Sequence, residues 1–88
     1  MSISIAEARA AELTFDSDNL IVHFTDGRVL YVPLTYFPRL LNATPEERDR
    51  YEISGGGTGL HWESIDEDIS VKGLLLGIGD LTRGTGLT

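Results

Sequence analysis

The sequence predicts a small α+β domain, in which an antiparallel β-meander of about three strands, a further hairpin and two or three short helices share one core. Three observations lead to this fold class. Apolar residues recur at every second position between Leu13 and Tyr31, which is typical of strands with one buried face. An Asp-Gly pair at 26–27 interrupts this alternation, as in tight hairpin turns. From residue 35 onward, Thr and Pro occur at positions typical of helix starts.

Length and composition allow one domain. The chain has 88 residues, of which 41% are hydrophobic, and a chain of this size has too little interior for two cores. We expect a flexible lead-in over residues 1–10, a single α+β domain over 11–77 and a disordered tail over 78–88. The chain has no cysteine, no export-signal pattern and no apolar run of the ~20 residues that span a bilayer. These features predict a cytoplasmic protein with no membrane partner.

The turns of the meander predict its register. A two-residue turn at 26–27 places two pairs of residues on the core face: Phe24 with Val29, and Val22 with Tyr31. A turn over residues 16–19 adds two pairs on the same face: Phe15 with Leu20, and Leu13 with Val22. This register leaves four residues on the opposite face: Ile21, His23, Leu30 and Val32. That face is apolar enough that we expect a helix, a fourth strand or another chain to cover it.

Two helix starts follow the meander. Thr35 is placed to cap a short helix over residues 36–41. Thr44 and Glu47 have the spacing of a capping box around a second start, with Pro45 at its first helical position. Three apolar residues of the first helix should face the core: Phe37, Leu40 and Leu41.

The last third of the chain predicts a second hairpin and a third helix. Two β-prone segments flank a glycine loop at 55–59. We expect residues 64–68 to form a loop and Ser70 to cap the helix that follows it, so that Asp66–Asp68 lie near the positive end of that helix. Four apolar residues should seal the core: Ile69, Val71, Leu74 and Leu75.

The charge balance limits the kind of partner. Fourteen acidic residues against seven basic ones give a formal net charge of −7. Affinity for nucleic acid comes largely from Lys and Arg that displace counterions, so direct nucleic-acid binding is disfavoured. The same acidity suits a protein that meets a basic partner.

No catalytic motif stands out, and we expect neither enzyme activity nor a cofactor. The glycine loop lacks the Gly-Lys-Ser/Thr ending of a phosphate-binding loop and leads into a strand. None of the serines Ser54, Ser64 and Ser70 lies in a nucleophile elbow. His61 and the acids at 66–68 do have the residue types of a divalent-metal site. Helix capping by these acids and packing of the His61-Trp62 pair explain the same residues without a metal.

The composition favours a protein-binding surface. Large rings and arginines occur together in the middle of the chain, a mixture that is enriched at protein interfaces and that also arises when a small core uses large rings. We predict seven partner-binding residues: Arg39, Arg48, His61, Trp62, Asp66, Glu67 and Asp68. The acidic loop would pair with a basic surface and steer association.

Several blocks occur in order between residues 11 and 77: Asp26-Gly27-Arg28, Phe37-Pro38-Arg39-Leu40, Ala43-Thr44-Pro45-Glu46-Glu47-Arg48, Gly57-Thr58-Gly59-Leu60-His61-Trp62 and Ile65-Asp66-Glu67-Asp68-Ile69-Ser70-Val71. Together they resemble the bacterial domain-of-unknown-function family numbered 2442. Tyr51 stands where relatives often have Trp, and Glu63 where they often have Pro. The resemblance implies a small α+β domain without established enzyme activity, often encoded beside another small protein in a toxin-antitoxin-like arrangement.

We therefore expect a non-catalytic protein-binding module, an antitoxin-like or regulatory component of a two-gene operon that masks a small basic protein encoded nearby. One alternative is a metal-dependent hydrolase that uses His61 and the Asp66–Asp68 loop. A second alternative is a homodimeric regulatory or ligand-sensing domain.

Overall fold

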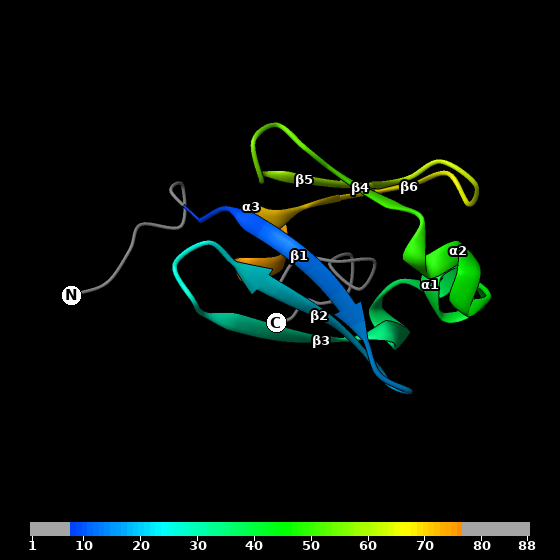
Figure 1. The fold of residues 1–88 in the computed structure, drawn as a ribbon. Helices are drawn as coiled ribbons and strands as arrows, with labels where there is room; N and C mark the ends of the chain where they lie inside the picture. Colours follow the sequence, from blue (N-terminus) through cyan, green and yellow to red (C-terminus); the bar gives the residue numbers. More distant parts are fainter. Residues whose placement is uncertain (1–7, 77–88) are drawn as a thin grey trace.

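Two three-stranded antiparallel sheets form the frame of the protein (Figure 1), in a computed structural model that describes residues 8–76. The first sheet has the order β1 (Ala10–Phe15), β2 (Asn19–Phe24), β3 (Val29–Pro33), and the second has the order β4 (Tyr51–Ser54), β5 (Gly59–Trp62), β6 (Glu67–Ser70). The helices are a 3-10 helix (Leu34–Tyr36), α1 (Pro38–Leu41), α2 (Pro45–Asp49) and α3 (Val71–Leu75). Within the described residues, no helix has the length and apolar character needed to cross a membrane. The predicted α+β class is confirmed.

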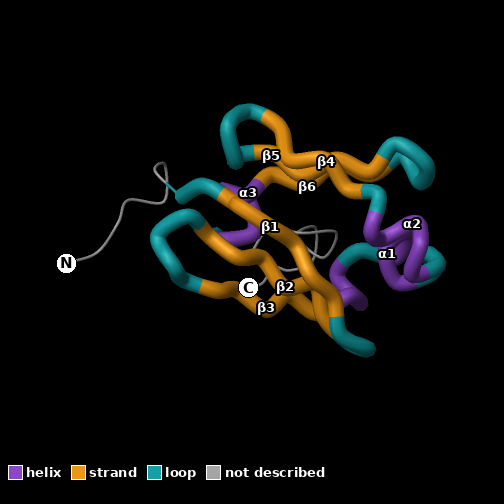
Figure 2. The backbone as a smooth tube through the Cα atoms, viewed as in Figure 1, coloured by secondary structure: helices purple, strands orange, loops and turns teal. Residues whose placement is uncertain are grey.

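One core lies between the sheets. Figure 2 shows the sheets facing each other, with α1 and α2 at one end. Side chains from both sheets and from the helices form a single buried cluster, whose fully buried members include Trp62, Leu20, Leu34, Leu40 and Leu60. The predicted core residues Ile69, Val71 and Leu74 are buried, and Leu75 packs against the cluster. The tail predicted over 78–88 lies wholly outside the described residues, as do residues 1–7 of the predicted lead-in. The rest of the lead-in is ordered against the core, because Ala8 and Ala10 are buried and β1 begins at Ala10.

The predicted register of the first sheet is confirmed between β1 and β2 and wrong between β2 and β3. Phe15 pairs with Leu20, and Leu13 with Val22, as predicted. The second turn has three residues rather than two, so the predicted Phe24–Val29 and Val22–Tyr31 pairs do not form: Val22 lies opposite Leu30, and Leu20 opposite Val32. Leu30 and Val32 therefore face the core, whereas Val29 and Tyr31 are 48% and 59% exposed.

The extra turn residue has a local cause. Gly27 N–H donates to the Phe24 carbonyl at 3.0 Å, and Phe24 N–H donates to the Arg28 carbonyl at 2.9 Å. Gly27 has φ +93°, the left-handed conformation in which glycine closes a three-residue hairpin loop. The Asp26 carboxylate accepts from Arg28 N–H and from Nε of Arg28. These two bonds tie the loop to the residue that directly precedes β3.

The helix starts were predicted correctly at Thr44 and incorrectly at Thr35. Thr44 and Glu47 form both hydrogen bonds of a capping box, with Pro45 at the first helical position of α2. Thr35 instead lies inside the 3-10 helix, and α1 begins after Phe37 without a side-chain cap. Leu40 is buried, but the short α1 turns Leu41 outward, 42% exposed.

The second sheet has one more strand than the predicted hairpin. Residues 67–70 form β6 and pair with β5, with Leu60 opposite Ile69. A tight turn makes this possible: Asp66 adopts φ +55°, and its N–H donates to the Glu63 carbonyl. The predicted loop therefore ends at Asp66, and the acids at 66–68 do not gather at the start of α3. Ser70 caps α3 as predicted, since its hydroxyl accepts from Gly73 N–H.

The glycine loop joins the two sheets. Ala10 N–H donates to the Gly57 carbonyl at 2.8 Å, and three residues further along β1, Leu13 N–H donates to the Tyr51 hydroxyl at 3.2 Å. Gly57 is buried, and a Cβ atom there would lie 3.0 Å from the backbone N and O of Ala10. The close approach of two backbones thus explains the glycine at this position.

Candidate protein-interaction site

His61 lies at the centre of the outer face of the second sheet. β5 is the middle strand, and the register places Glu52 of β4 and Asp68 of β6 directly opposite His61 on its two sides. Residues opposite each other in an antiparallel pair share a face. The neighbours of His61 along β5, Leu60 and Trp62, point the other way and are buried. The alternation of β5 therefore fixes His61 on the outside.

A hydrogen bond ties His61 to Asp68. Nδ1 of His61 lies 2.7 Å from Oδ1 of Asp68, with the His61 side chain 30% exposed and the Asp68 side chain 77% exposed. This bond raises the pKa of His61 above its ordinary value of 6.5, partial desolvation opposes the rise, and the negative charges of Asp68, Glu52 and Glu63 add to it. The face thus favours positive charge at its centre.

Together these residues form an acidic face, which we define as Glu52, His61, Glu63 and Asp68. A shallow depression of about 360 Å³ adjoins it, lined in part by Asp68 and by the hydroxyl-bearing residues Ser54, Thr58 and Ser70. Carboxylates next to hydroxyls offer hydrogen-bond acceptors to Lys and Arg side chains. The chemistry of the acidic face therefore suits a basic surface.

The predicted acidic loop is divided among three environments. Asp66 lies in the turn between β5 and β6, with a side chain that is 93% exposed. Glu67 and Asp68 follow each other in β6, so their side chains point to opposite faces of the sheet. Asp68 is on the same face as His61 and forms a hydrogen bond with it. Within residues 8–76, no group of three or more His, Cys, Asp or Glu side chains is arranged to hold a metal ion.

The two predicted arginines make contacts within the chain. Nη1 of Arg39 donates to the Asp66 carbonyl and lies 4.0 Å from the Asp66 carboxylate. Arg48 donates from Nε to the Leu40 carbonyl and from Nη2 to the Leu41 carbonyl, both at 2.9 Å. Arg39 is still exposed enough to touch a partner, whereas the guanidinium of Arg48 mainly stabilises the end of α1.

Trp62 belongs to the core. Its side chain is fully buried, and Nε1 donates to the Arg48 carbonyl at 3.0 Å. A partner cannot reach this ring in the folded chain, although the sequence grouped it with His61. The alternation of β5 separates the two neighbours, because one points outward and the other inward.

Sequence reasoning missed Glu52 and Glu63 as neighbours of His61. The signal for Glu52 was present, because the hairpin that joins 51–54 to 59–62 pairs residue 52 with residue 61.

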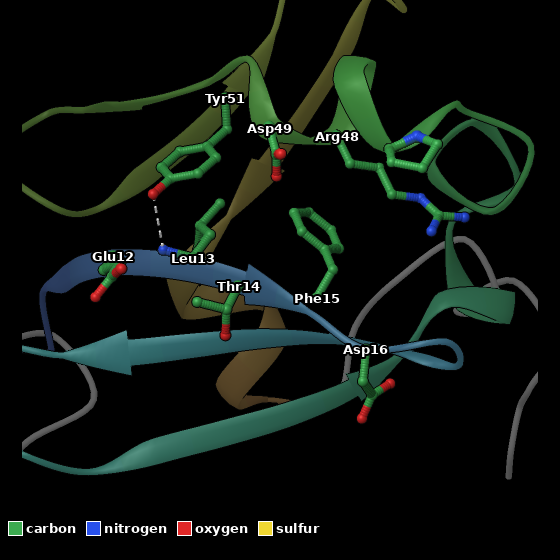
Figure 3. Close-up of a pocket in the computed structure, with 9 residues that line it drawn as sticks. Glu12, Leu13, Thr14, Phe15, Asp16, Arg48, Asp49 and Tyr51 are labelled. Carbon is green, nitrogen blue, oxygen red and sulfur yellow. Dashed lines mark hydrogen bonds between the residues drawn. The ribbon is translucent and has the colours of Figure 1, made fainter.

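Sequence reasoning also missed a groove of about 650 Å³ between β1 and α2, which Figure 3 shows in close-up. Its lining comes from segments more than 25 residues apart: Glu12, Leu13, Thr14, Phe15 and Asp16 on one side, and Pro45, Arg48, Asp49 and Tyr51 on the other.

The fold and the acidic face define a small α+β domain with two facing antiparallel sheets and a charged outer surface on one of them. The chain belongs to the family described as "Protein of unknown function (DUF2442)", which matches residues 10–80. This confirms the resemblance inferred from the sequence blocks.

Two solved structures are similar to the chain over most of its length. A crystal structure of a protein of unknown function from Rhodospirillum rubrum has 36% sequence identity and a TM-score of 0.73, covering 91% of this chain and 94% of that one. A solution NMR structure of an uncharacterized protein from Chromobacterium violaceum has 26% identity and a TM-score of 0.70, covering 92% of this chain and 72% of that one. No curated protein matches the chain significantly.

Proposed function

We propose that this protein is a non-catalytic protein-binding module that docks through the acidic face onto a basic surface of a partner protein. One observation carries the proposal: the strand register places Glu52 and Asp68 on either side of a partly exposed His61, with Glu63 close enough to add to the negative field. Like charges held on one rigid sheet face accelerate encounter with a surface of opposite charge.

Two of the arginines do not neutralise this face. Arg39 lies at Asp66 in the adjacent turn, and Arg48 donates to carbonyls of α1. Glu52 and Glu63 make no hydrogen bond or ion pair within residues 8–76, so their charges are available to a partner, while Asp68 shares its charge with His61. In this proposal the partner is a small basic protein encoded nearby, and the module acts as an antitoxin-like or regulatory component that masks its surface in the cytoplasm.

The test is co-expression with the product of the adjacent gene, followed by affinity measurement across salt concentrations. Neutralising the face in the double variant E52Q/E63Q should weaken binding and flatten its salt dependence, because fewer charges are then screened. The control is D18N/E46Q, which removes the same charge from exposed positions outside the acidic face. Equal affinities of the two double variants, or no association of the parent chain at low salt, would count against the proposal.

A homodimeric regulatory domain is a second candidate, and one observation favours it. Val29 and Tyr31 are exposed on β3, one of the two edge strands of the first sheet, and exposed apolar side chains on an edge strand favour association. Sedimentation of the chain alone separates the candidates. A dimer at micromolar concentration that Y31K disrupts supports the second candidate, whereas a monomer that binds only a basic partner supports the first.

A further inference from the structure

β1 presents a free backbone edge to the groove between β1 and α2. Asp16 N–H donates to the Asn19 carbonyl across the first turn. Hydrogen-bonded and non-hydrogen-bonded pairs alternate along an antiparallel ladder. The backbone N–H and carbonyl of Thr14 therefore point toward Ile21 of β2, whereas those of Leu13 and Phe15 point away from β2. The bond from Leu13 N–H to the Tyr51 hydroxyl, 3.2 Å long, agrees with this direction.

Part of this edge has no partner. Near its start, β1 is linked to the second sheet by Ala10 and Leu13. Beyond Leu13, the Leu13 carbonyl and the N–H and carbonyl of Phe15 make no hydrogen bond within residues 8–76. Such a row of donors and acceptors is a template for another strand. Four consecutive residues of β1, Glu12 to Phe15, line the groove together with Asp16 of the turn, so the row opens into it.

The groove also carries unpaired negative charge. Glu12 and Asp49 make no hydrogen bond or ion pair within the described residues, and Figure 3 shows the Asp49 side chain between Tyr51 and Phe15, directed toward β1. The third acid, Asp16, accepts from Asn19 and Asp18 in the turn. Arg48, the one cation of the lining, donates to two carbonyls of α1 and lies 6.0 Å from the centre of the Phe15 ring.

We propose that the edge of β1 binds an extended, basic peptide segment of a partner as an added strand, with a Lys or Arg side chain between the Tyr51 and Phe15 rings and against the Asp49 carboxylate. Backbone hydrogen bonds to Phe15 and Leu13 provide the pairing, and the acids select the charge of the segment. A second copy of this chain is a poorer occupant, because pairing two β1 edges brings Glu12 and Asp49 of both copies together. The edge shares no residue with the acidic face around His61, so this inference stands without the proposed function.

The experiment is a titration of the ¹⁵N-labelled full chain with a seven-residue peptide in which Arg and Lys alternate with Val and Thr. We expect saturable shifts of the Leu13 and Phe15 amides and slowed hydrogen exchange at Phe15. Two further peptides are methylated at the backbone nitrogens of one edge or of the other. A strand pairs with β1 through one edge only, so one methylated peptide should bind about tenfold more weakly or worse, and the other should bind nearly as well as the parent.

A charge variant tests the role of the groove acids. D49N should weaken peptide binding about three- to fivefold, whereas E46Q, the same change on the outside of α2, should leave it unchanged. Three results would each overturn the proposal: shifts confined to Glu52, His61 and Asp68, equal binding of both methylated peptides, or no saturation at millimolar peptide. A dimer of the free chain that protects the Phe15 amide would assign the edge to a second copy and overturn it as well.

Discussion

Nδ1 of His61 lies 2.7 Å from Oδ1 of Asp68 across β5 and β6, on the exposed face of the second sheet. The hydrogen bond to Asp68 is the largest cause that raises the pKa of His61 above 6.5. The folded chain therefore binds a proton at His61 more tightly than the unfolded chain does. This extra stability is fully present below pH 6.5 and is lost as the pH rises through the folded-state pKa of His61.

Replacing Asp68 by Asn should lower the pKa of His61 toward 6.5 and remove most of this pH dependence. NMR titration of the His61 ring protons measures the pKa, and urea unfolding on both sides of pH 6.5 measures the stability. The matched control is E46Q, which removes a carboxylate from an exposed position of α2, outside the acidic face. An unchanged His61 titration in D68N would show that the 2.7 Å contact does not persist in solution.

The capping box of α2 gives a second prediction. Thr44 accepts from Glu47 N–H at 3.1 Å, and the Glu47 carboxylate accepts from Thr44 N–H at 2.9 Å. T44A should lower the free energy of unfolding by about 1 kcal/mol, because a helix N–H then loses its acceptor. The control is T35A, which changes an exposed Thr that makes no side-chain hydrogen bond in the described residues and should cost less than about 0.5 kcal/mol. Equal losses in urea titrations would argue against the cap.

Local signals predicted the parts of the fold that local interactions determine. The capping box at Thr44 and the cap at Ser70 depend on residues three positions apart, and both formed as predicted. Thr35 has the right residue type for a cap, but the chain enters a 3-10 helix at Leu34, which is fully buried. Packing of Leu34 thus overrode the local preference of Thr35.

The candidate site was predicted only in part, because it depends on pairing between distant strands. His61 and Asp68 were identified from their residue types, whereas their contact required β6, which periodicity over four residues could not separate from a loop. Trp62 was grouped with His61 because they are adjacent in sequence. Their opposite directions follow from the strand that holds them.

The register of β2 and β3 can be tested with two adjacent residues. Val32 is 4% exposed and Tyr31 is 59% exposed, the reverse of what a two-residue turn would give. V32A should lower the free energy of unfolding by about 2 kcal/mol through lost burial and a residual cavity. Y31A should cost less than about 1 kcal/mol. Urea unfolding of both variants decides the register, and a larger loss in Y31A would restore the two-residue turn.

Gly57 gives the sharpest stability prediction. Gly56 and Gly57 both have positive φ, +66° and +108°, but a Cβ atom at Gly56 meets nothing within 4 Å. A Cβ atom at Gly57 would lie 2.8 Å from Cβ of Arg9 and 3.0 Å from the backbone of Ala10. G56A should therefore cost about 1 kcal/mol, the price of the left-handed backbone alone.

G57A should cost at least about 2 kcal/mol, because its methyl group also forces apart the backbones of Ala10 and Gly57. Loss of the 2.8 Å bond from Ala10 N–H to the Gly57 carbonyl should speed hydrogen exchange at the Ala10 amide in G57A and not in G56A. Urea unfolding and amide exchange of the two variants measure both effects. Equal stabilities together with equal exchange at Ala10 would mean that the glycine loop does not hold the start of β1 against the second sheet.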